Sequence, residues 1–305
     1  MQKKNFWNNR ICKKFHNAEV KPHNPQNFKF SRSIFKFNSN GLVFLAVEID
    51  IVSDLFYAFL ALVYVLACVL IPKILQQKKK ISKFAARKAV HFLAGLTIFV
   101  TPYLTIPWFA VAIASIMTIV TYKSSKHSSS EAFKGLYAAI GEEAEEAKGY
   151  LQGPFHYALA ITLLISAFAV VFQATGLSLF YLPIAGILVM VISDTLASVI
   201  GRKWGKHEIH VPWIKTKRTL EGSLAFLVSG WLLCFFAFGV FGVFLPGYSI
   251  RLSLPNAMIL SIVAAAIGSV VEVITPSTWD DITIPIATTA IISLLAFSLQ
   301  LIVID

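Results

Sequence analysis

The sequence predicts an all-α fold, a polytopic transmembrane helical bundle of about eight spans, and three observations lead to this fold class. Of the 305 residues, 56% are hydrophobic and only 14% are charged. The mean hydropathy is +0.69, a value that few soluble domains reach. The apolar residues also form long continuous runs, which favours helices, because only helices and closed barrels satisfy their backbone hydrogen bonds in hydrocarbon.

Eight apolar runs have lengths that suit a membrane crossing, which takes roughly 20 residues of helix. The second and third runs are short, and they meet between Pro102 and Pro107, which favours a tight turn. The eight candidate spans are 51–71, 89–104, 106–122, 155–172, 179–200, 223–244, 254–274 and 282–303.

A basic tail over residues 1–45 precedes the multi-span membrane domain, which we assign to residues 46–305. Residues 1–40 contain nine Lys or Arg and one acid, Glu19, and so carry +8 of the chain's net charge of +11. The tail shows no clear periodicity, so we expect it to lack regular structure. A basic segment beside a membrane domain is attracted to water and lipid headgroups, and we expect no nucleic-acid partner.

The distribution of Lys and Arg predicts the orientation of the spans. The loops at 73–88, 123–154 and 201–221 contain seven, four and six of these residues, and they alternate with nearly uncharged connections. Because cationic loops stay in the cytoplasm, we expect these loops and 275–281 to face it, with both termini on the other side. The basic tail conflicts with this orientation, and we give the three loops more weight because they agree.

A helix at the membrane interface is expected at residues 128–148. Ser128 and Glu131 have the spacing of a capping box at its start. The acidic run at 142–146 favours a solvated face over a metal site. The helix would bury an apolar stripe made by Phe133, Leu136, Tyr137 and Ile140.

The first candidate site motif is SDTLASVIGRKWGK, residues 193–206. Asp194 lies about two turns inside its span, and helical spacing places it on one face with Ser198 and Arg202. Ionisable residues inside membrane helices usually have a function. A carboxylate there is suited to Mg²⁺, which binds through one or two carboxylates and substrate phosphates. The alternative is a structural ion pair between Asp194 and Arg202.

The second motif is KTKRTLEGS, residues 215–223. Lys215, Lys217 and Arg218 are donors suited to phosphate oxygens. Glu221 opens the following span, and Gly222 permits a close approach of the backbone. The alternative is that these cations only flank a span on its cytoplasmic side.

The third motif is VEVITPSTWDDITIP, residues 271–285, where one span ends and the last begins. Glu272, Asp280 and Asp281 face the same side of the membrane as Asp194, and such a group suits a divalent metal or a general base. The preference for acids at helix starts explains one of the two aspartates but leaves Glu272 unexplained.

The fourth motif is RKAVH, residues 87–91, in which Arg87 and His91 share a helix face. A histidine at such a place is more often a structural hydrogen-bonding group than a catalyst. GRKWGK at 201–206 is not a P-loop, because it is one residue short between its glycines and His207 replaces the required Ser or Thr. Phosphoryl transfer would therefore need another kind of site.

These four motifs, in this order, resemble the CTP-dependent polyprenol kinase family, which includes dolichol kinases, phytol kinases and a CTP-dependent diacylglycerol kinase. The resemblance covers about residues 85–303 and leaves out the tail and the first span. It implies transfer of the terminal phosphate of a nucleotide, typically CTP, to a lipid alcohol such as phytol, geranylgeraniol or dolichol, with Mg²⁺. The partners would be the lipid alcohol, the nucleotide and the bilayer.

The resemblance also implies roles for individual residues. The catalytic carboxylates would be Asp194, Asp281 and Glu272, and either Asp194 or Asp281 would be the base. The metal would lie on Asp194, Asp280 and Asp281, and the lipid substrate would meet Arg87 and His91. The nucleotide would bind to Ser198, Arg202, Lys203, Lys215, Lys217, Arg218, Glu221, Gly222 and Ser223.

Two other functions fit parts of the sequence. A phosphatidate cytidylyltransferase would also use CTP but would release pyrophosphate, and its full C-terminal Asp/Arg signature is missing here. A transporter or channel would place charges near the middle of the bilayer, whereas these charges lie near one interface. The identity of the lipid alcohol, the choice of CTP over ATP or UTP, and the oligomeric state stay open at the level of the sequence.

Overall fold

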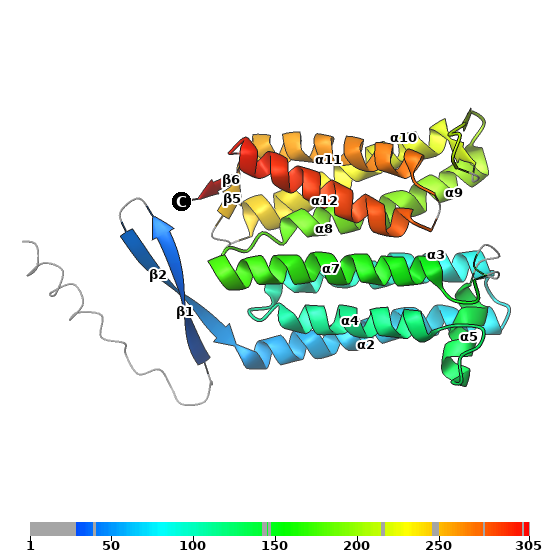
Figure 1. Ribbon diagram of the computed structural model, residues 1–305, viewed down its shortest axis with the longest axis horizontal. Coiled ribbons are helices and arrows are strands. Elements are labelled where there is room, and N and C mark those ends of the chain that lie inside the picture. Colours follow the sequence, from blue (N-terminus) through cyan, green and yellow to red (C-terminus); the bar gives the residue numbers. More distant parts are fainter. Residues whose placement is uncertain are drawn as a thin grey trace, which may run out of the picture.

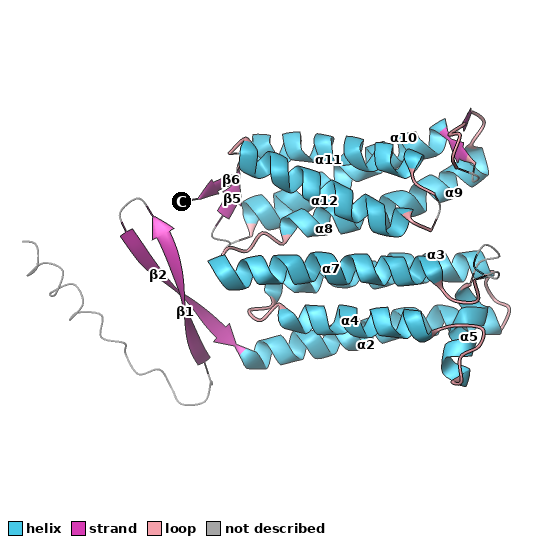
Figure 2. Ribbon diagram, viewed as in Figure 1, coloured by secondary structure: helices cyan, strands magenta, loops and turns pink. Residues whose placement is uncertain are grey.

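The computed structural model describes residues 29–38, 41–141, 145, 148–214, 217–245, 250–276, 278–300 and 302–304. These residues form a bundle of long helices that run side by side, with short strands only at its ends (Figures 1 and 2). Seven helices are long and apolar enough to cross a membrane, so the chain is a multi-pass membrane protein. They are Ile51–Gln77, Lys83–Tyr103, Gln152–Thr175, Tyr181–Trp204, Leu220–Phe244, Leu254–Ile274 and Asp280–Ser298.

The first half of the bundle contains the first three predicted spans. Helix α2 (Ile51–Gln77) is followed by α3 (Lys83–Gly95), which tightens into the 3₁₀ segment η1 (Leu96–Tyr103). After a sharp turn, α4 (Trp108–Lys123) runs back toward the start of α3, and with 16 residues it is shorter than the seven long helices. With α4, the seven long helices account for all eight predicted spans.

The turn between η1 and α4 is tied to α2 by one buried carboxylate. The side chain of Asp54 accepts hydrogen bonds from the Thr105 amide at 2.9 Å, the Thr105 hydroxyl at 2.8 Å and the Ile106 amide at 2.7 Å. These three donors satisfy an acid that has no exposed surface. The turn that the sequence predicts at Pro102 and Pro107 is thus anchored at the end of the bundle away from the charged motifs.

The second half surrounds a central helix that the rest of the chain covers. Helix α8 and the wide π-helical segment η2 are buried except for Ile192, and they continue directly into α9, whose first residue is Asp194. Such π-helical turns are frequent at functional sites. The elements are α7 (Gln152–Thr175), α8 (Tyr181–Leu188), η2 (Val189–Ser193), α9 (Asp194–Trp204), α10 (Leu220–Ala237), η3 (Phe238–Phe244), α11 (Leu254–Ile274) and α12 (Asp280–Ser298).

The four loops that the sequence predicts on one face lie together at one end of the bundle (Figure 1). At this end, α5 (Glu131–Ile140) packs its buried Leu136 and Ile140 against the helices, and β3 (Glu208–Ile209) pairs with β4 (Arg218–Thr219). At the other end, β5 (Ile250–Leu252) pairs with β6 (Ile302–Ile304). We refer to the end that contains α5 and the β3–β4 pair as the basic end.

The N-terminal tail differs from the expectation where the structure describes it. An antiparallel hairpin of β1 (Lys29–Asn38) and β2 (Gly41–Asp50) leads into α2. Its sequence is rich in Phe, Val and Ile, which favour extended backbone. The expected lack of regular structure therefore does not hold for this part of the tail. The rest of that prediction concerns residues 1–28 and 39–40, which lie outside the described residues.

Two local predictions around α5 are wrong. The N-cap of α5 is Ser130, which makes no side-chain capping bond, so the capping box of Ser128 and Glu131 does not form. Instead, the Ser128 hydroxyl accepts a hydrogen bond from the Ser130 amide at 3.4 Å. In the acidic run, Glu145 is fully buried rather than solvated, and its neighbours at 142–144 and 146–147 lie outside the described residues.

Candidate active site

Charged side chains from five elements meet inside the basic end of the bundle. Helices α3 and α12 begin there, α9 and α11 end there, and β4 leads into α10 there, so motifs far apart in the sequence become neighbours (Figure 1). None of the charged side chains in this cluster is more than 19% exposed. The cluster consists of Lys88, His91, Asp194, Arg218, Glu272, Asp280 and Asp281.

Asp194 forms an ion pair with a residue of α3 rather than with one of its own helix. One carboxylate oxygen accepts a hydrogen bond from the Lys88 ammonium at 2.9 Å. The ion pair with Arg202 that the sequence offered as an alternative does not form, since Arg202 lies over the ring of Phe84 at 4.0 Å. The Asp194–Lys88 pair therefore joins α9 to α3 across the cluster.

Arg218 bridges two further carboxylates. Its two terminal nitrogens lie 2.7 Å from Glu272 and 3.0 Å from Asp280, and one of them also donates to the Thr275 carbonyl at 3.2 Å. Burial alone would lower the pKa of Arg218, but the facing Glu272 and Asp280 raise it above its usual value, so the guanidinium stays charged. Its buried Nε has no hydrogen-bond partner among the described residues, so one donor is left for a ligand.

His91 and Asp281 face each other through two acceptor atoms. His91 Nε2 lies 3.3 Å from the Met190 carbonyl, which can only accept, so Nε2 carries the proton. In a neutral ring, Nδ1 then presents a lone pair, and it lies 3.6 Å from an Asp281 oxygen. Two such atoms repel unless a cation or a shared donor lies between them. The two acceptor atoms could therefore bind a proton, a metal ion or a hydroxyl group between them.

The composition of the cluster fits a divalent cation. Ligand atoms of His91, Asp194 and Asp281 all lie within 4.8 Å of one another. The cluster's four carboxylates face two permanent cations, Lys88 and Arg218, which leaves a formal excess of two negative charges when all are ionised. Oxygen ligands from Asp194 and Asp281 suit Mg²⁺, whereas the imidazole nitrogen of His91 suits transition metals better.

Arg87 and Glu145 form a buried pair beside the cluster. Arg87 lies 2.8 Å from a Glu145 oxygen, and the other Glu145 oxygen accepts the Gly153 amide at 2.7 Å. A Cβ at Gly153 would overlap an Arg87 guanidinium nitrogen, so a larger residue there would require Arg87 to move. The pair ties α3 to the segment before α7.

The sequence-derived site residues divide into two groups. Arg87, His91, Asp194, Arg218, Ser223, Glu272, Asp280 and Asp281 lie in or against the cluster, where the Ser223 hydroxyl reaches Glu272 at 3.5 Å. The remaining described residues lie at its edge.

Five of these edge residues have other partners. Ser198 donates to the Thr195 carbonyl, Lys203 lies over Trp204, Lys217 pairs with Glu208, Glu221 pairs with His207, and Gly222 packs against Ala197 of α9. Lys215 lies outside the described residues.

Sequence reasoning missed Lys88 and the α7 residues next to the cluster. Lys88 was interpreted only as a cation flanking a span, although it lies three residues before His91 and thus on the same helix face. The Tyr157 hydroxyl donates to the His91 carbonyl at 2.8 Å, and His156 hydrogen-bonds the Thr278 carbonyl in the turn before α12. No motif signalled the α7 residues, because their role depends on tertiary packing.

Comparison with known proteins gives two relatives. No family model and no solved structure matches the chain. A phytol kinase of Synechocystis sp. is 28% identical over 178 residues, covering 57% of this chain and 67% of the relative. A dolichol kinase of Saccharomyces cerevisiae is 29% identical over 166 residues, covering 54% of this chain and 29% of the relative. These two similarities support the assignment of the chain to the polyprenol kinase family.

Proposed function

We propose that this protein is a membrane lipid kinase that transfers the terminal phosphate of a nucleoside triphosphate, CTP in the first place, to the hydroxyl of a polyprenol-type alcohol. The names of the two relatives support the reaction class. The observation that carries the proposal is the His91–Asp281 pair, whose two facing acceptors lie 3.6 Å apart beside Asp194. A substrate hydroxyl placed there would supply the missing donor.

Asp281 is the better candidate for the general base. Asp194 already accepts a hydrogen bond from the Lys88 ammonium at 2.9 Å, so its carboxylate is engaged in an ion pair. The Asp281 side chain has no cation as close as this among the described residues, and its nearest ion-pair partner is His91. In this reaction Asp281 takes the hydroxyl proton while the alcohol oxygen attacks the terminal phosphorus. The bond from that phosphorus to the bridging oxygen breaks, and the nucleoside diphosphate leaves.

The cationic residues of the site are suited to bind the phosphates of the nucleotide. Lys88 and Arg218 lie inside the cluster, and the Arg218 Nε has no hydrogen-bond partner among the described residues. Both cations neutralise charge on the phosphoryl group during its transfer. Arg202, Lys203 and Lys217 lie exposed at the rim, where they attract the nucleotide. Asp194 would hold Mg²⁺, which would neutralise charge on the phosphate oxygens when it is bound, so that Asp281 stays available as the base.

A transfer assay on the purified protein in detergent tests this function. Nucleoside triphosphates labelled in the terminal phosphate (CTP, ATP and UTP) would be supplied with Mg²⁺ and, separately, phytol, geranylgeraniol, a dolichol or diacylglycerol. A labelled lipid monophosphate with release of the nucleoside diphosphate is the expected result, and CTP is expected to be the best donor. Release of pyrophosphate with a cytidylylated lipid would instead identify a cytidylyltransferase.

A further inference from the structure

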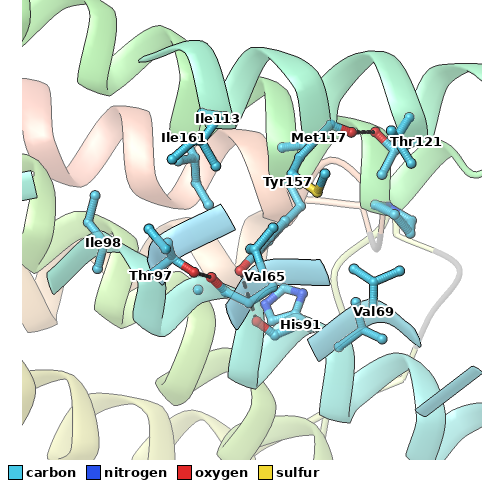
Figure 3. A pocket seen from close by; sticks show the side chains of 18 of the residues that line it. Val65, Val69, His91, Thr97, Ile98, Ile113, Met117, Thr121, Tyr157 and Ile161 are labelled. Carbon is cyan, nitrogen blue, oxygen red and sulfur yellow. Dashed lines mark hydrogen bonds between the residues drawn. The ribbon is translucent and has the colours of Figure 1, made fainter. Parts of the chain in front are cut away.

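An apolar pocket leads from the charged cluster into the first half of the bundle. Its walls come from α2, α3, η1, α4 and α7, with α5 covering the basic end (Figure 3). His91, Arg87 and Asp281 line one end, while Asp194 is not part of the lining. The pocket therefore opens onto the side of the cluster where the His91 and Asp281 acceptors face each other.

The pocket lining offers few polar atoms to a ligand beyond that end. The Thr97 hydroxyl donates to the Ala94 carbonyl, and the Thr121 hydroxyl donates to carbonyls of its own helix. The Tyr157 hydroxyl donates to the His91 carbonyl, as Figure 3 shows. With these hydroxyls already bonded, the wall is suited to a hydrocarbon chain whose one polar group lies at His91 and Asp281.

The pocket is long, and the turn tied to α2 lies at its far end. Its lining residues on α3 and η1 run from Arg87 to Leu104, which at roughly 1.5 Å per residue in the α-helix and roughly 2.0 Å in the 3₁₀ segment is about 30 Å, the thickness of a bilayer's hydrocarbon core. At the far end it is lined by Thr101 and Leu104, both buried, next to the turn that Asp54 holds. A chain that enters from the cluster would thus meet a wall.

We infer that this pocket binds the single hydrocarbon chain of the alcohol substrate, with the hydroxyl at His91 and Asp281, and that its far end limits the length of chain accepted. This inference rests on the proposed function and adds to it the site of the substrate's hydrocarbon chain and a limit on the length of that chain. A pocket with one charged end and apolar walls fits one prenyl-type chain better than the paired acyl chains of diacylglycerol. Small side chains on α4, Ala110 near the far end and Ala114 one turn closer to the cluster, leave the space for that chain.

Two substitutions on α4 test the length limit. Ala110→Phe fills the far end, and Ala114→Phe fills the middle of the pocket. Alcohols with two, three and four isoprene units (geraniol, farnesol and geranylgeraniol) would be compared by kcat/KM. Ala110→Phe is expected to lower the preference for geranylgeraniol over geraniol by at least about tenfold. Ala114→Phe is expected to shift the preference further and to disfavour farnesol as well.

Ala112→Phe is the matched control, because Ala112 lies on the same helix but is exposed and outside the pocket lining. It is expected to leave the chain-length preference unchanged. An equal loss of activity toward all three alcohols in the two pocket variants, or no change in any of them, would overturn the inference.

A labelling experiment separates the pocket from the proposed reaction. A geranylgeraniol analogue with a photoreactive diazirine at the end of its chain would be irradiated with the intact protein in detergent and the labelled peptides identified. The expected labels lie in η1 and the start of α4, and Ala110→Phe removes them whereas Ala112→Phe does not. Labels spread over the outer surface in all variants would refute the pocket even if lipid phosphate forms. Specific labels without any phosphoryl transfer would refute the kinase and leave the pocket standing.

Discussion

In the reaction that we propose, Lys88 and Arg218 hold charge in the cluster and Asp281 takes up a proton. Lys88 lies 2.9 Å from Asp194, and Arg218 lies within 3.0 Å of Glu272 and Asp280, whereas the ion-pair partner of Asp281 among the described residues is His91, at 3.6 Å. The sequence predicted the carboxylates, because acids inside membrane spans are costly and stand out. It could not choose the base, because that choice depends on which acid Lys88 reaches, and Lys88 lies 106 residues before Asp194.

Arg218 is expected to need its planar guanidinium. A Lys at this position has a single ammonium and cannot reach Glu272 and Asp280 while also donating to a phosphate. Arg218→Lys should therefore lower kcat/KM for phosphoryl transfer at least about tenfold. Lys134→Arg is the control, because Lys134 lies on α5 outside the cluster and pairs with Glu131 at the surface. Equal activity of both variants would remove Arg218 from the site.

Asp194 is expected to determine the requirement for metal. Asp194→Asn removes one of the negative charges that offset a divalent ion, and the concentration of Mg²⁺ for half-maximal activity should rise at least about tenfold. The variant should still insert into membranes, which fractionation checks. Chelation of Mg²⁺ should abolish transfer by the unaltered protein, and readdition should restore it. Full activity of the variant at low Mg²⁺ would exclude Asp194 as a metal ligand.

At the scale of elements, the order and number of spans were readable from hydropathy, and the observed ends lie within six residues of the predicted ones. The packing that brings the motifs together was not readable. Gly222 shows why: a Cβ there would lie 2.9 Å from the Ala197 carbonyl, so its lack of a side chain sets the distance between α9 and α10. The sequence indicates that a glycine permits another helix to approach closely, but it does not indicate which helix does so.

This close approach gives a prediction for stability. Gly222→Ala should push α10 away from α9 and lower the free energy of unfolding by about 1–3 kcal/mol. Gly239→Ala is the control, because a Cβ there would meet no atom within 4 Å, and it should be neutral or slightly stabilising. Thermal unfolding of both variants in the same detergent measures the difference. Equal midpoints would show that the helices do not pack as closely as described.

The buried Arg87–Glu145 pair carries a second stability prediction. Glu145→Gln removes the charge opposite a buried guanidinium and should cost about 3 kcal/mol. Glu131→Gln is the control, because Glu131 is 87% exposed and its pair with Lys134 should contribute little. The comparison of thermal midpoints also tests the burial of Glu145, which the sequence placed on a solvated face. A smaller loss for Glu145→Gln than for Glu131→Gln would contradict that burial.

At the scale of the whole molecule, the three basic loops and the turn at 275–281 lie at one end of the bundle, as the Lys and Arg distribution predicted. We expect this end to face the cytoplasm. Cysteines introduced at Lys79 and Lys206 should react with an impermeant maleimide only from the cytoplasmic side, and one at Ala174 only from the other. The native Cys68 and Cys234 are buried and should react little. Reaction of Ala174→Cys from the cytoplasmic side would reverse the orientation.

The most direct test of the account is the Asp281→Asn variant in the phosphoryl transfer assay. The substitution keeps the size of the side chain but removes the proton acceptor that faces His91. Because a general base contributes roughly a hundredfold to ten-thousandfold, the rate of lipid monophosphate formation should fall about a thousandfold while the lipid pocket still binds the photoreactive alcohol. Transfer at the rate of the unaltered protein would contradict the central claim that the alcohol hydroxyl is activated at Asp281.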